Sequence, residues 1–212
     1  MYFFYKDKYL DNLINSNKAE WDKMLNHKFV KEMVNGSLDK KYFNSYLRIE
    51  HSFVLDAIDH MAMALHYADS LISKKKLLKI IDGLLNNQLD YFNKLLDDQI
   101  EITVIPKKAI LFKEFMENCS MKGYEEIVVS FLAAESLYNN WCSIKNSNNK
   151  HIAVYSDWIN LHTDNLFYEQ VKFFANEAQR INSDLVPSSK QKDIFNKTLL
   201  YEIEFHDSIY SK

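Results

Sequence analysis

Glycine and proline, the residues that most often interrupt regular structure, are almost absent from this chain. Its 212 residues include 3 glycines and 2 prolines. Few positions therefore provide tight turns, and long uninterrupted segments with helical periodicity are expected. The sequence predicts an all-α protein. Because no internal repeat or linker divides the chain, we expect one helical domain over residues 1–212.

Apolar periodicity and turn residues together place the helices along the chain. They are expected over residues 6–24, 28–34, 40–67, 71–100, 106–119, 124–145, 153–178 and 191–210. The first helix should be irregular near Ser16 and Asn17. Gly36 can adopt the left-handed conformation that ends the second, and Ser37 or Asp39 can cap the third. Loops are expected over residues 103–106, 146–150 and 184–189.

Charge and composition exclude several classes of protein. The net charge is −3 with the two signs interspersed, so no basic surface for nucleic acid is expected. No stretch approaches the roughly 18 apolar residues of a membrane span. The N-terminus lacks the apolar core of a signal peptide. The two cysteines form no C-x-x-C pair, and a reduced, cytoplasmic location fits best.

Three glutamates interrupt the apolar stripes of three expected helices. Glu50, Glu135 and Glu202 each have apolar side chains three or four residues before and after them. That spacing puts each carboxylate on the inward face of its helix. Because an ionised carboxylate is costly to bury alone, each could be a core carboxylate with a hydrogen-bond partner. Three on separate helices favour a shared polar pocket inside a helical bundle.

Two further residues lie near these glutamates in the helical pattern. Cys142 shares the face of Glu135 and Tyr138, and it is interpreted as a small buried hydrophobe rather than a nucleophile. His162 follows Trp158 by one turn, and alone it is more often a satisfied core residue than a ligand. The chain has no G-x-S-x-G, phosphate-binding glycine loop, H-E-x-x-H or E-x-x-H motif.

An ordered set of motifs carries a resemblance to a known family. The segments are His27-Lys28-Phe29-Val30, Gly36-Ser37-Leu38, Phe43-x-x-Tyr46-Leu47-x-x-Glu50-x-x-Phe53, Tyr155-x-x-Trp158-Ile159-x-x-His162 and Tyr201-Glu202-x-x-Phe205-His206-Asp207. Over nearly the whole chain they resemble the TenA/THI-4 family of thiaminase II-like proteins. The resemblance implies a haem-oxygenase-like multi-helix bundle, a homotetramer, and a small pyrimidine as substrate. We expect no cofactor and no metal.

The segment around Glu135 departs from one branch of that family. Cysteine-type members carry a nucleophile in an A-x-L-P-C-x-W context, whereas this chain reads Ala133-Ala134-Glu135-Ser136-Leu137-Tyr138. It is therefore similar to the glutamate-type branch, which lacks the cysteine. The substrate implied is 4-amino-5-aminomethyl-2-methylpyrimidine, a thiamin breakdown product, or its N-formyl derivative.

The resemblance also implies roles for individual residues. Glu135 would activate water or act as the nucleophile, Glu202 would serve as general acid–base, and Glu50 would hold the pyrimidine amine and ring nitrogen. The aromatic walls of the site are expected from Phe53, Phe112, Tyr138 and Trp158, with His162 beside them. Phe53, Phe112 and His162 stand where cysteine-type members often have tyrosines.

Two other functions stay open at this point. Di-iron oxidases use the same fold, and Glu50, Glu135, His162 and Glu169 could supply part of such a site. Ala57 and Leu166, however, stand where further ligands would be needed. The other alternative is a non-catalytic regulator that binds a pyrimidine or thiamin.

Overall fold

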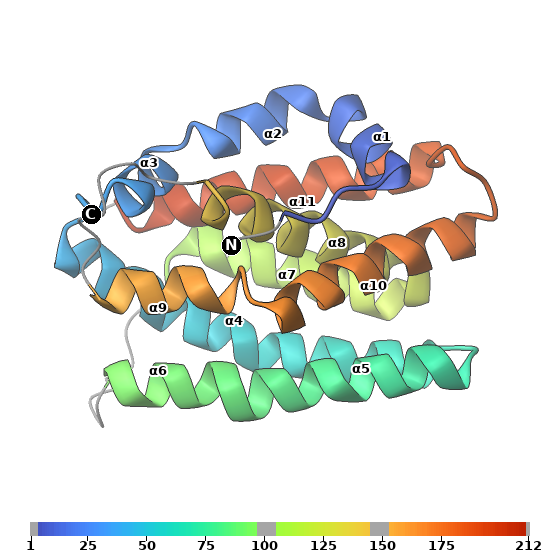
Figure 1. Ribbon diagram of the computed structural model, residues 1–212, viewed down its shortest axis with the longest axis horizontal. Helices are drawn as coiled ribbons and strands as arrows, with labels where there is room; N and C mark the ends of the chain where they lie inside the picture. The colour runs from blue at the N-terminus through green and yellow to red at the C-terminus, as the bar shows by residue number, and fades with distance from the viewer. Residues whose placement is uncertain (1–3, 97–104, 145–152, 211–212) are drawn as a thin grey trace. The chain divides into compact units, whose positions relative to one another are not determined.

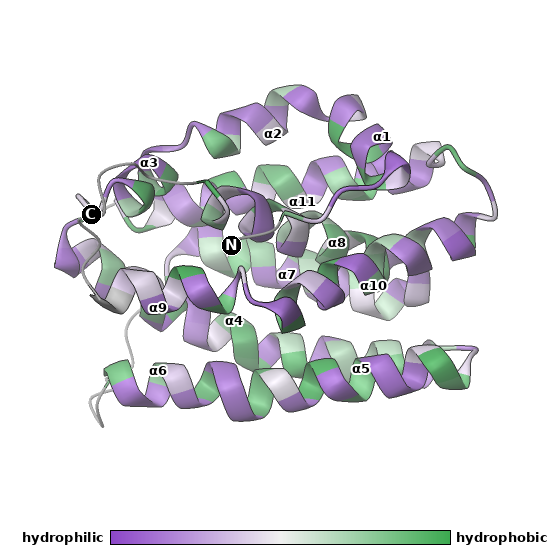
Figure 2. Cartoon of the chain, in the orientation of Figure 1, coloured by the Kyte–Doolittle hydropathy of each residue, from purple (hydrophilic) through white to green (hydrophobic). Residues whose placement is uncertain are grey.

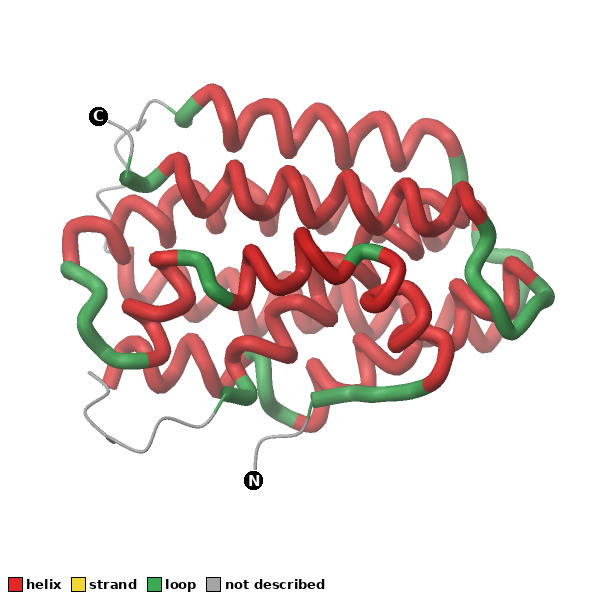
Figure 3. The backbone as a smooth tube through the Cα atoms, turned by 90° about the horizontal axis from the view of Figure 1, so that it is seen from above, coloured by secondary structure: helices red, strands yellow, loops and turns green. Residues whose placement is uncertain are grey.

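Every regular element in the described part of the protein is a helix. The computed structural model describes residues 4–96, 105–144 and 153–210, and Figure 3 shows helices joined by loops throughout these ranges. The all-α prediction is confirmed. The expected loop over residues 146–150 and the expected helix ends at Ile100 and Lys145 lie outside the described residues, as do Thr103 and Val104. No helix described is both long and apolar enough to cross a membrane.

The chain forms two compact units. Unit 1 comprises Met1–Leu38 and Val128–Ile203, and unit 2 comprises Asp39–Ile127 and Glu204–Lys212. Two helices, α8 (Tyr124–Cys142) and α11 (Ser189–Ser208), contribute residues to both units. The single domain expected over residues 1–212 stays a prediction.

Unit 1 holds the N-terminal helices and most of the second half of the chain. Its elements are α1 (Lys8–Ser16), α2 (Lys18–Leu25), α3 (Lys28–Val34), α9 (Ala153–Leu161), α10 (Asn165–Asn182) and most of α8 and α11. α1 packs against α2 and α10. The Tyr9 hydroxyl donates to Gln191 Oε1, and Gln191 Nε2 donates to Ala178 O at 2.9 Å. These bonds tie α1, α10 and α11 together.

Helix α8 is buried on nearly all sides. From Ile127 to Cys142, every side chain is buried except Glu135 and Asn140. A helix that is apolar around its whole circumference belongs in a protein interior. The partial exposure of Glu135 therefore stands out on this helix.

Unit 2 is built around the longest helix. Its elements are α4 (Lys40–Tyr67), α5 (Leu71–Gly83), the π-helical turn η1 (Leu84–Gln88), α6 (Leu89–Leu96) and α7 (Lys107–Lys122). α4 packs against α5, η1, α6 and α7. Figure 1 shows α5, η1 and α6 as one continuous rod beside α4. Along that rod, Figure 2 shows hydrophobic and hydrophilic residues alternating, as a helix with one buried face requires.

The observed helix boundaries confirm much of the sequence prediction and correct part of it. The helices expected over residues 28–34 and 40–67 are α3 and α4, and Gly36 has φ 66°. The expected irregularity near Asn17 is a break between α1 and α2. Pro106 is the residue before α7 rather than part of its first turn. The helix expected over residues 71–100 contains the π-helical turn η1.

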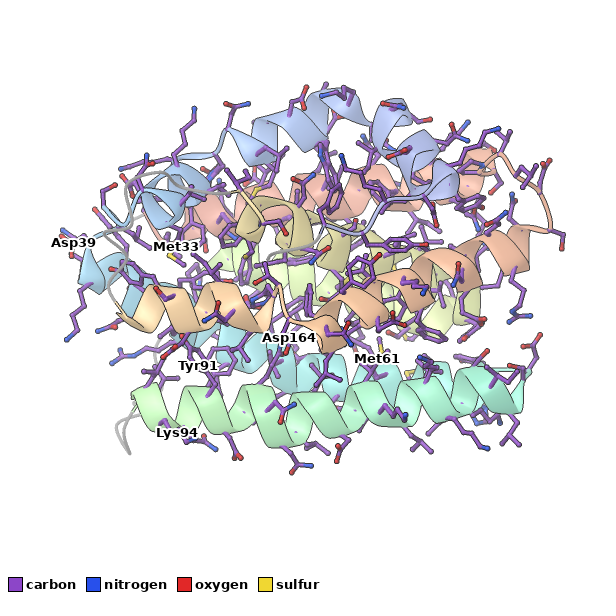
Figure 4. The ribbon with its side chains drawn as sticks, viewed as in Figure 1. Met33, Asp39, Met61, Tyr91, Lys94 and Asp164 are labelled. Carbon is purple, nitrogen blue, oxygen red and sulfur yellow. The ribbon has the colours of Figure 1, made fainter. Side chains whose placement is uncertain are left out.

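The helix predicted over residues 153–178 is wrong, because the chain breaks between α9 and α10. Asp164 caps α10, since its side chain accepts a 2.7 Å hydrogen bond from Phe167 N. Figure 4 labels Asp164 in this break. Thr163 Oγ1 donates to Ile159 O at 2.8 Å, which satisfies a carbonyl at the end of α9. His162 therefore lies in the turn between two helices, not within one.

Candidate active site

Glu135 lies at the centre of α8 with its side chain partly accessible to solvent. Burial raises the pKa of this carboxyl group to about 8, and a hydrogen bond from the Gln170 side chain lowers it in part. Desolvation favours the neutral acid, while a donor favours the carboxylate. Near neutral pH both forms of Glu135 are populated, as proton transfer requires.

Three aromatic rings contact His162, which lies in the turn that follows α9. The His162 ring stacks on Tyr138 with centroids 5.1 Å apart, lies 4.2 Å from Trp158 and meets Phe167 edge-on at 4.8 Å. Tyr138 is one turn beyond Glu135 on α8. Unit 1 thus brings together three of the residues singled out in the sequence, Tyr138, Trp158 and His162, and Glu135 lies one helical turn from Tyr138.

The protonation state of His162 follows from its partners. Its Nδ1 lies 2.9 Å from Trp158 O, and because a carbonyl can only accept, Nδ1 carries the proton. Burial lowers the pKa of His162 to about 4, although the bond to the Trp158 carbonyl acts in the opposite direction. The imidazole is therefore neutral at pH 7. Its Nε2 is left with a lone pair that can accept a hydrogen bond.

An asparagine on α8 holds the turn that carries His162. Asn139 Nδ2 donates to His162 O at 2.9 Å, and Asn139 Oδ1 accepts from Tyr5 N at 2.9 Å. Asn139 is fully buried, so both bonds are shielded from water. Sequence reasoning missed Asn139, as it missed Gln170. Neither amide belongs to a motif, and their importance depends on partners distant in sequence.

Unit 2 contains a second set of site residues: Glu50, Phe53 and Phe112. Glu50 is buried on α4, one turn before Phe53. The Phe53 and Phe112 rings stack with centroids 4.8 Å apart and an angle of 24°. Phe205 approaches both, at 6.0 and 5.8 Å. Phe112 is buried, whereas Phe53 keeps some accessible surface, so Phe53 is the ring of this pair that a ligand could touch.

Glu202 is the most deeply buried of the three glutamates, with 1% of its surface exposed. It lies on the same face of α11 as Phe195, seven residues earlier. Phe195 stacks on Trp21 of α2 with centroids 6.1 Å apart. The inward orientation expected for Glu50 and Glu202 is confirmed by their burial, whereas Glu135 is only partly buried.

The two cysteines are unsuited to nucleophilic chemistry. Both are buried free thiols, and burial raises the pKa of Cys142 well above its usual value. Because the thiolate is the reactive form, Cys142 is inert at neutral pH. Its interpretation as a small buried hydrophobe is confirmed. In residues 4–96, 105–144 and 153–210, no group of three His, Cys, Asp or Glu side chains is arranged to hold a metal ion.

The sequence matches a protein family over most of its length. The profile of the TENA/THI-4/PQQC family matches residues 15–212. A relative from Halalkalibacterium halodurans named aminopyrimidine aminohydrolase is 23% identical over 206 residues, which cover 91% of this chain and 91% of the relative.

Solved structures share the fold. A TenA homologue from P. horikoshii OT3 superposes with a TM-score of 0.81 at 18% identity, covering 94% of this chain and 97% of that one. A protein from Silicibacter sp. TM1040 described as a TenA family transcription regulator has a TM-score of 0.87 at 13% identity, with 99% of both chains covered. At these identities the likeness shows the fold alone.

Proposed function

The chain belongs to the TENA/THI-4/PQQC family, and on that premise we propose that it is a thiamin-salvage hydrolase acting on aminopyrimidine breakdown products of thiamin. The reaction is hydrolysis of a C–N bond. It releases ammonia from the 5-aminomethyl pyrimidine, or formate from the N-formyl derivative. The name of the Halalkalibacterium halodurans relative, aminopyrimidine aminohydrolase, supports this substrate class.

The observation that carries the proposal is the environment of Glu135. Its carboxyl group is partly accessible on a helix that is otherwise almost wholly buried, and its pKa is raised to about 8. A general base is most effective when its pKa lies near the working pH. Glu135 stands in the segment where cysteine-type members carry their nucleophile, and the buried Cys142 thiol cannot replace it.

The three glutamates divide the work of hydrolysis in this proposal. Glu135 takes a proton from water, and the water oxygen bonds to the carbon of the C–N bond. Glu202 gives a proton to the leaving nitrogen as that bond breaks. Glu50 accepts hydrogen bonds from the amino group of the pyrimidine, in charge-assisted contacts that fix its orientation. The alternative for Glu135 is direct attack as the nucleophile.

The aromatic residues hold a flat ring. Phe53 provides an accessible face, and Phe112 supports it from behind at 4.8 Å. Tyr138 and His162 form a stacked pair, and the Trp158 ring lies 4.2 Å from the His162 ring. Because His162 Nε2 can only accept while the ring is neutral, it would select a substrate group that donates a hydrogen bond.

Glu135→Gln tests the proposal directly. The 5-aminomethyl pyrimidine and its N-formyl derivative are each incubated with purified protein in the presence of a metal chelator. Ammonia and formate are measured, and the products are identified by mass. We expect turnover in the wild type. In Glu135→Gln it should fall on the order of 10²–10⁴-fold, because an amide cannot accept the proton.

Two matched controls separate this role from general effects of substitution. Glu126→Gln makes the same change nine residues, about two and a half turns, earlier on α8, and Cys142→Ala removes the buried thiol. Both should keep turnover near the wild-type level. Full activity in Glu135→Gln would refute the assigned mechanism. No turnover of either compound by the wild type would refute the hydrolase proposal, and tight pyrimidine binding without turnover would then indicate a binding protein.

A further inference from the structure

Helices α8 and α10 run antiparallel, in a register that side-chain pairs define. Phe131 on α8 stacks on Phe174 of α10 with centroids 5.9 Å apart. Four residues further along α8 and four residues back along α10 come Glu135 and Gln170, and the Gln170 side chain acts as a hydrogen-bond donor on the pKa of the Glu135 carboxyl group. Because four residues make about one turn, the two pairs lie in successive layers.

The same register continues into a third layer. Three residues beyond Glu135 is Tyr138, and three residues before Gln170 is Phe167. Both rings contact His162, at 5.1 and 4.8 Å between centroids. The polar pair of Glu135 and Gln170 therefore lies between two aromatic layers.

The Glu135 carboxylate comes about one helical turn from an aromatic ring on either side along α8, and burial raises its pKa. A carboxylate in apolar surroundings needs a donor close by. The Gln170 side chain carries an amide NH₂ group with two N–H donors and no charge of its own. It comes from a different helix, so the bond also limits how the Glu135 side chain can rotate.

We propose that Gln170 is a positioning residue for the hydrolysis: its amide holds the Glu135 carboxylate in one orientation and stabilises its charged form. The role in hydrolysis rests on the proposed function. The bond itself does not, and it can be tested on the free protein. Gln170 touches neither water nor substrate in this scheme and acts only through Glu135.

The titration of Glu135 reports on this bond. Burial raises the pKa of Glu135 to about 8, and the Gln170 hydrogen bond holds it below the value that burial alone would produce. The titratable side chains in the adjoining layer are Tyr138 and His162. His162 is neutral at pH 7 because burial lowers its pKa to about 4. A change at Gln170 should therefore appear as a change in the pKa of Glu135.

The test is a carboxyl titration by NMR on protein labelled with ¹³C at the glutamate side-chain carboxyl carbon. Comparison with Glu135→Gln identifies the Glu135 resonance. In Gln170→Met, which keeps the length and loses the donors, the pKa of Glu135 should rise by about one unit, a tenfold change in its ionisation constant. Gln179→Met changes the same residue type on the same helix at similar exposure, and should leave the Glu135 titration unchanged.

A second variant covers the case in which Gln170→Met does not fold. Gln170→Glu keeps the shape but replaces the donor with a carboxylate, and the like charge should also raise the pKa of Glu135. An unchanged Glu135 titration in a folded Gln170 variant would overturn the inference. If the wild type hydrolyses pyrimidines, the pH at which kcat/KM reaches half its maximum should rise in Gln170→Met by the same amount. A shifted titration in a protein without turnover would refute the proposed function and leave the Gln170–Glu135 bond standing.

Discussion

At the scale of single residues, Glu135 and His162 show how one environment acts oppositely on an acid and a base. Burial penalises the charged form of each. For the carboxyl group of Glu135 the charged form is the deprotonated one, so its pKa rises to about 8. For the His162 imidazole it is the protonated one, so its pKa falls to about 4. At neutral pH the candidate site therefore combines a carboxyl group close to its titration point with an uncharged imidazole.

The raised pKa of Glu135 leads to a pH dependence of turnover. A general base works only when ionised, so kcat/KM should increase from pH 6 and level off above about 8. Initial rates at limiting substrate across this range measure it, with buffers matched in ionic strength. A kcat/KM that falls steadily between pH 6 and 8 would mean that Glu135 acts in its protonated form, and its role would change to that of the acid.

At the scale of secondary structure, the N-terminus of α10 depends on one side chain. Asp164 accepts from Phe167 N at 2.7 Å, which satisfies one of the free amides of the first turn. Asp164→Ala should lower the free energy of unfolding by about 1 kcal/mol. Asp164→Asn, which also caps well, should lose only a few tenths of that amount. Urea unfolding followed by circular dichroism measures both.

The control for the capping prediction is an aspartate within a helix. Asp193 is exposed on α11, where it pairs with Lys197 at 2.8 Å. Asp193→Ala should change the free energy of unfolding by less than about 0.5 kcal/mol. An equal loss in Asp193→Ala and Asp164→Ala would show that removal of charge, not of the cap, is responsible.

The helix ends could be predicted where the sequence marks them. Gly36 takes the left-handed conformation after α3, and Asp39 accepts from Lys41 N at the start of α4. Both signals are local, so no knowledge of the rest of the fold is needed. The boundaries of these two helices followed directly.

The break before α10 could not be predicted in the same way. Trp158, His162 and Leu166 are spaced by four residues, which is typical of one continuous helix. The structure leaves Leu166 67% exposed, so the apolar stripe does not continue past the break. Hydrogen bonds hold the turn after α9, among them one from Asn139 of α8 to His162 O. Such bonds leave no periodic pattern in the sequence.

The residues of the candidate site likewise divide into those that the sequence marks and those that only a distant partner makes distinctive. Glu50 and Glu202 could be found because a carboxylate in an apolar stripe is conspicuous. Gln170 could not, because a neutral amide on a helix is common and only its partner on α8 makes it distinctive. The π-helical turn η1 was missed for a related reason: its residues, Leu84–Gln88, are also compatible with an α-helix.

At the scale of the whole molecule, stability should depend on pH through these same groups. Glu135 has a folded-state pKa above its ordinary 4.5, so its contribution is lost as pH rises from 4.5 to about 8. His162 has a folded-state pKa below its ordinary 6.5, so its contribution is lost as pH falls from 6.5 to about 4. Between pH 4.5 and 6.5 these two contributions change the free energy of unfolding in opposite directions and largely cancel. His60, whose pKa is also lowered by burial, adds to the loss of stability as the pH falls.

Glu135→Gln should separate the contributions of Glu135 and His162 to the pH dependence of stability. In the wild type, the free energy of unfolding should fall on the order of 2 kcal/mol between pH 6.5 and 8, less if solvent screens the partly exposed carboxyl group. In Glu135→Gln that fall should disappear. Stability should instead rise from pH 4.5 to 6.5, because the contribution of His162 is no longer offset by that of Glu135. Trp21, Trp141 and Trp158 all belong to unit 1, as Glu135 does, so tryptophan fluorescence during urea unfolding reports on the relevant unit. Since other groups titrate equally in both proteins, the difference between the two curves isolates Glu135. A difference that stays constant from pH 5 to 8 would mean that its pKa is not raised by folding.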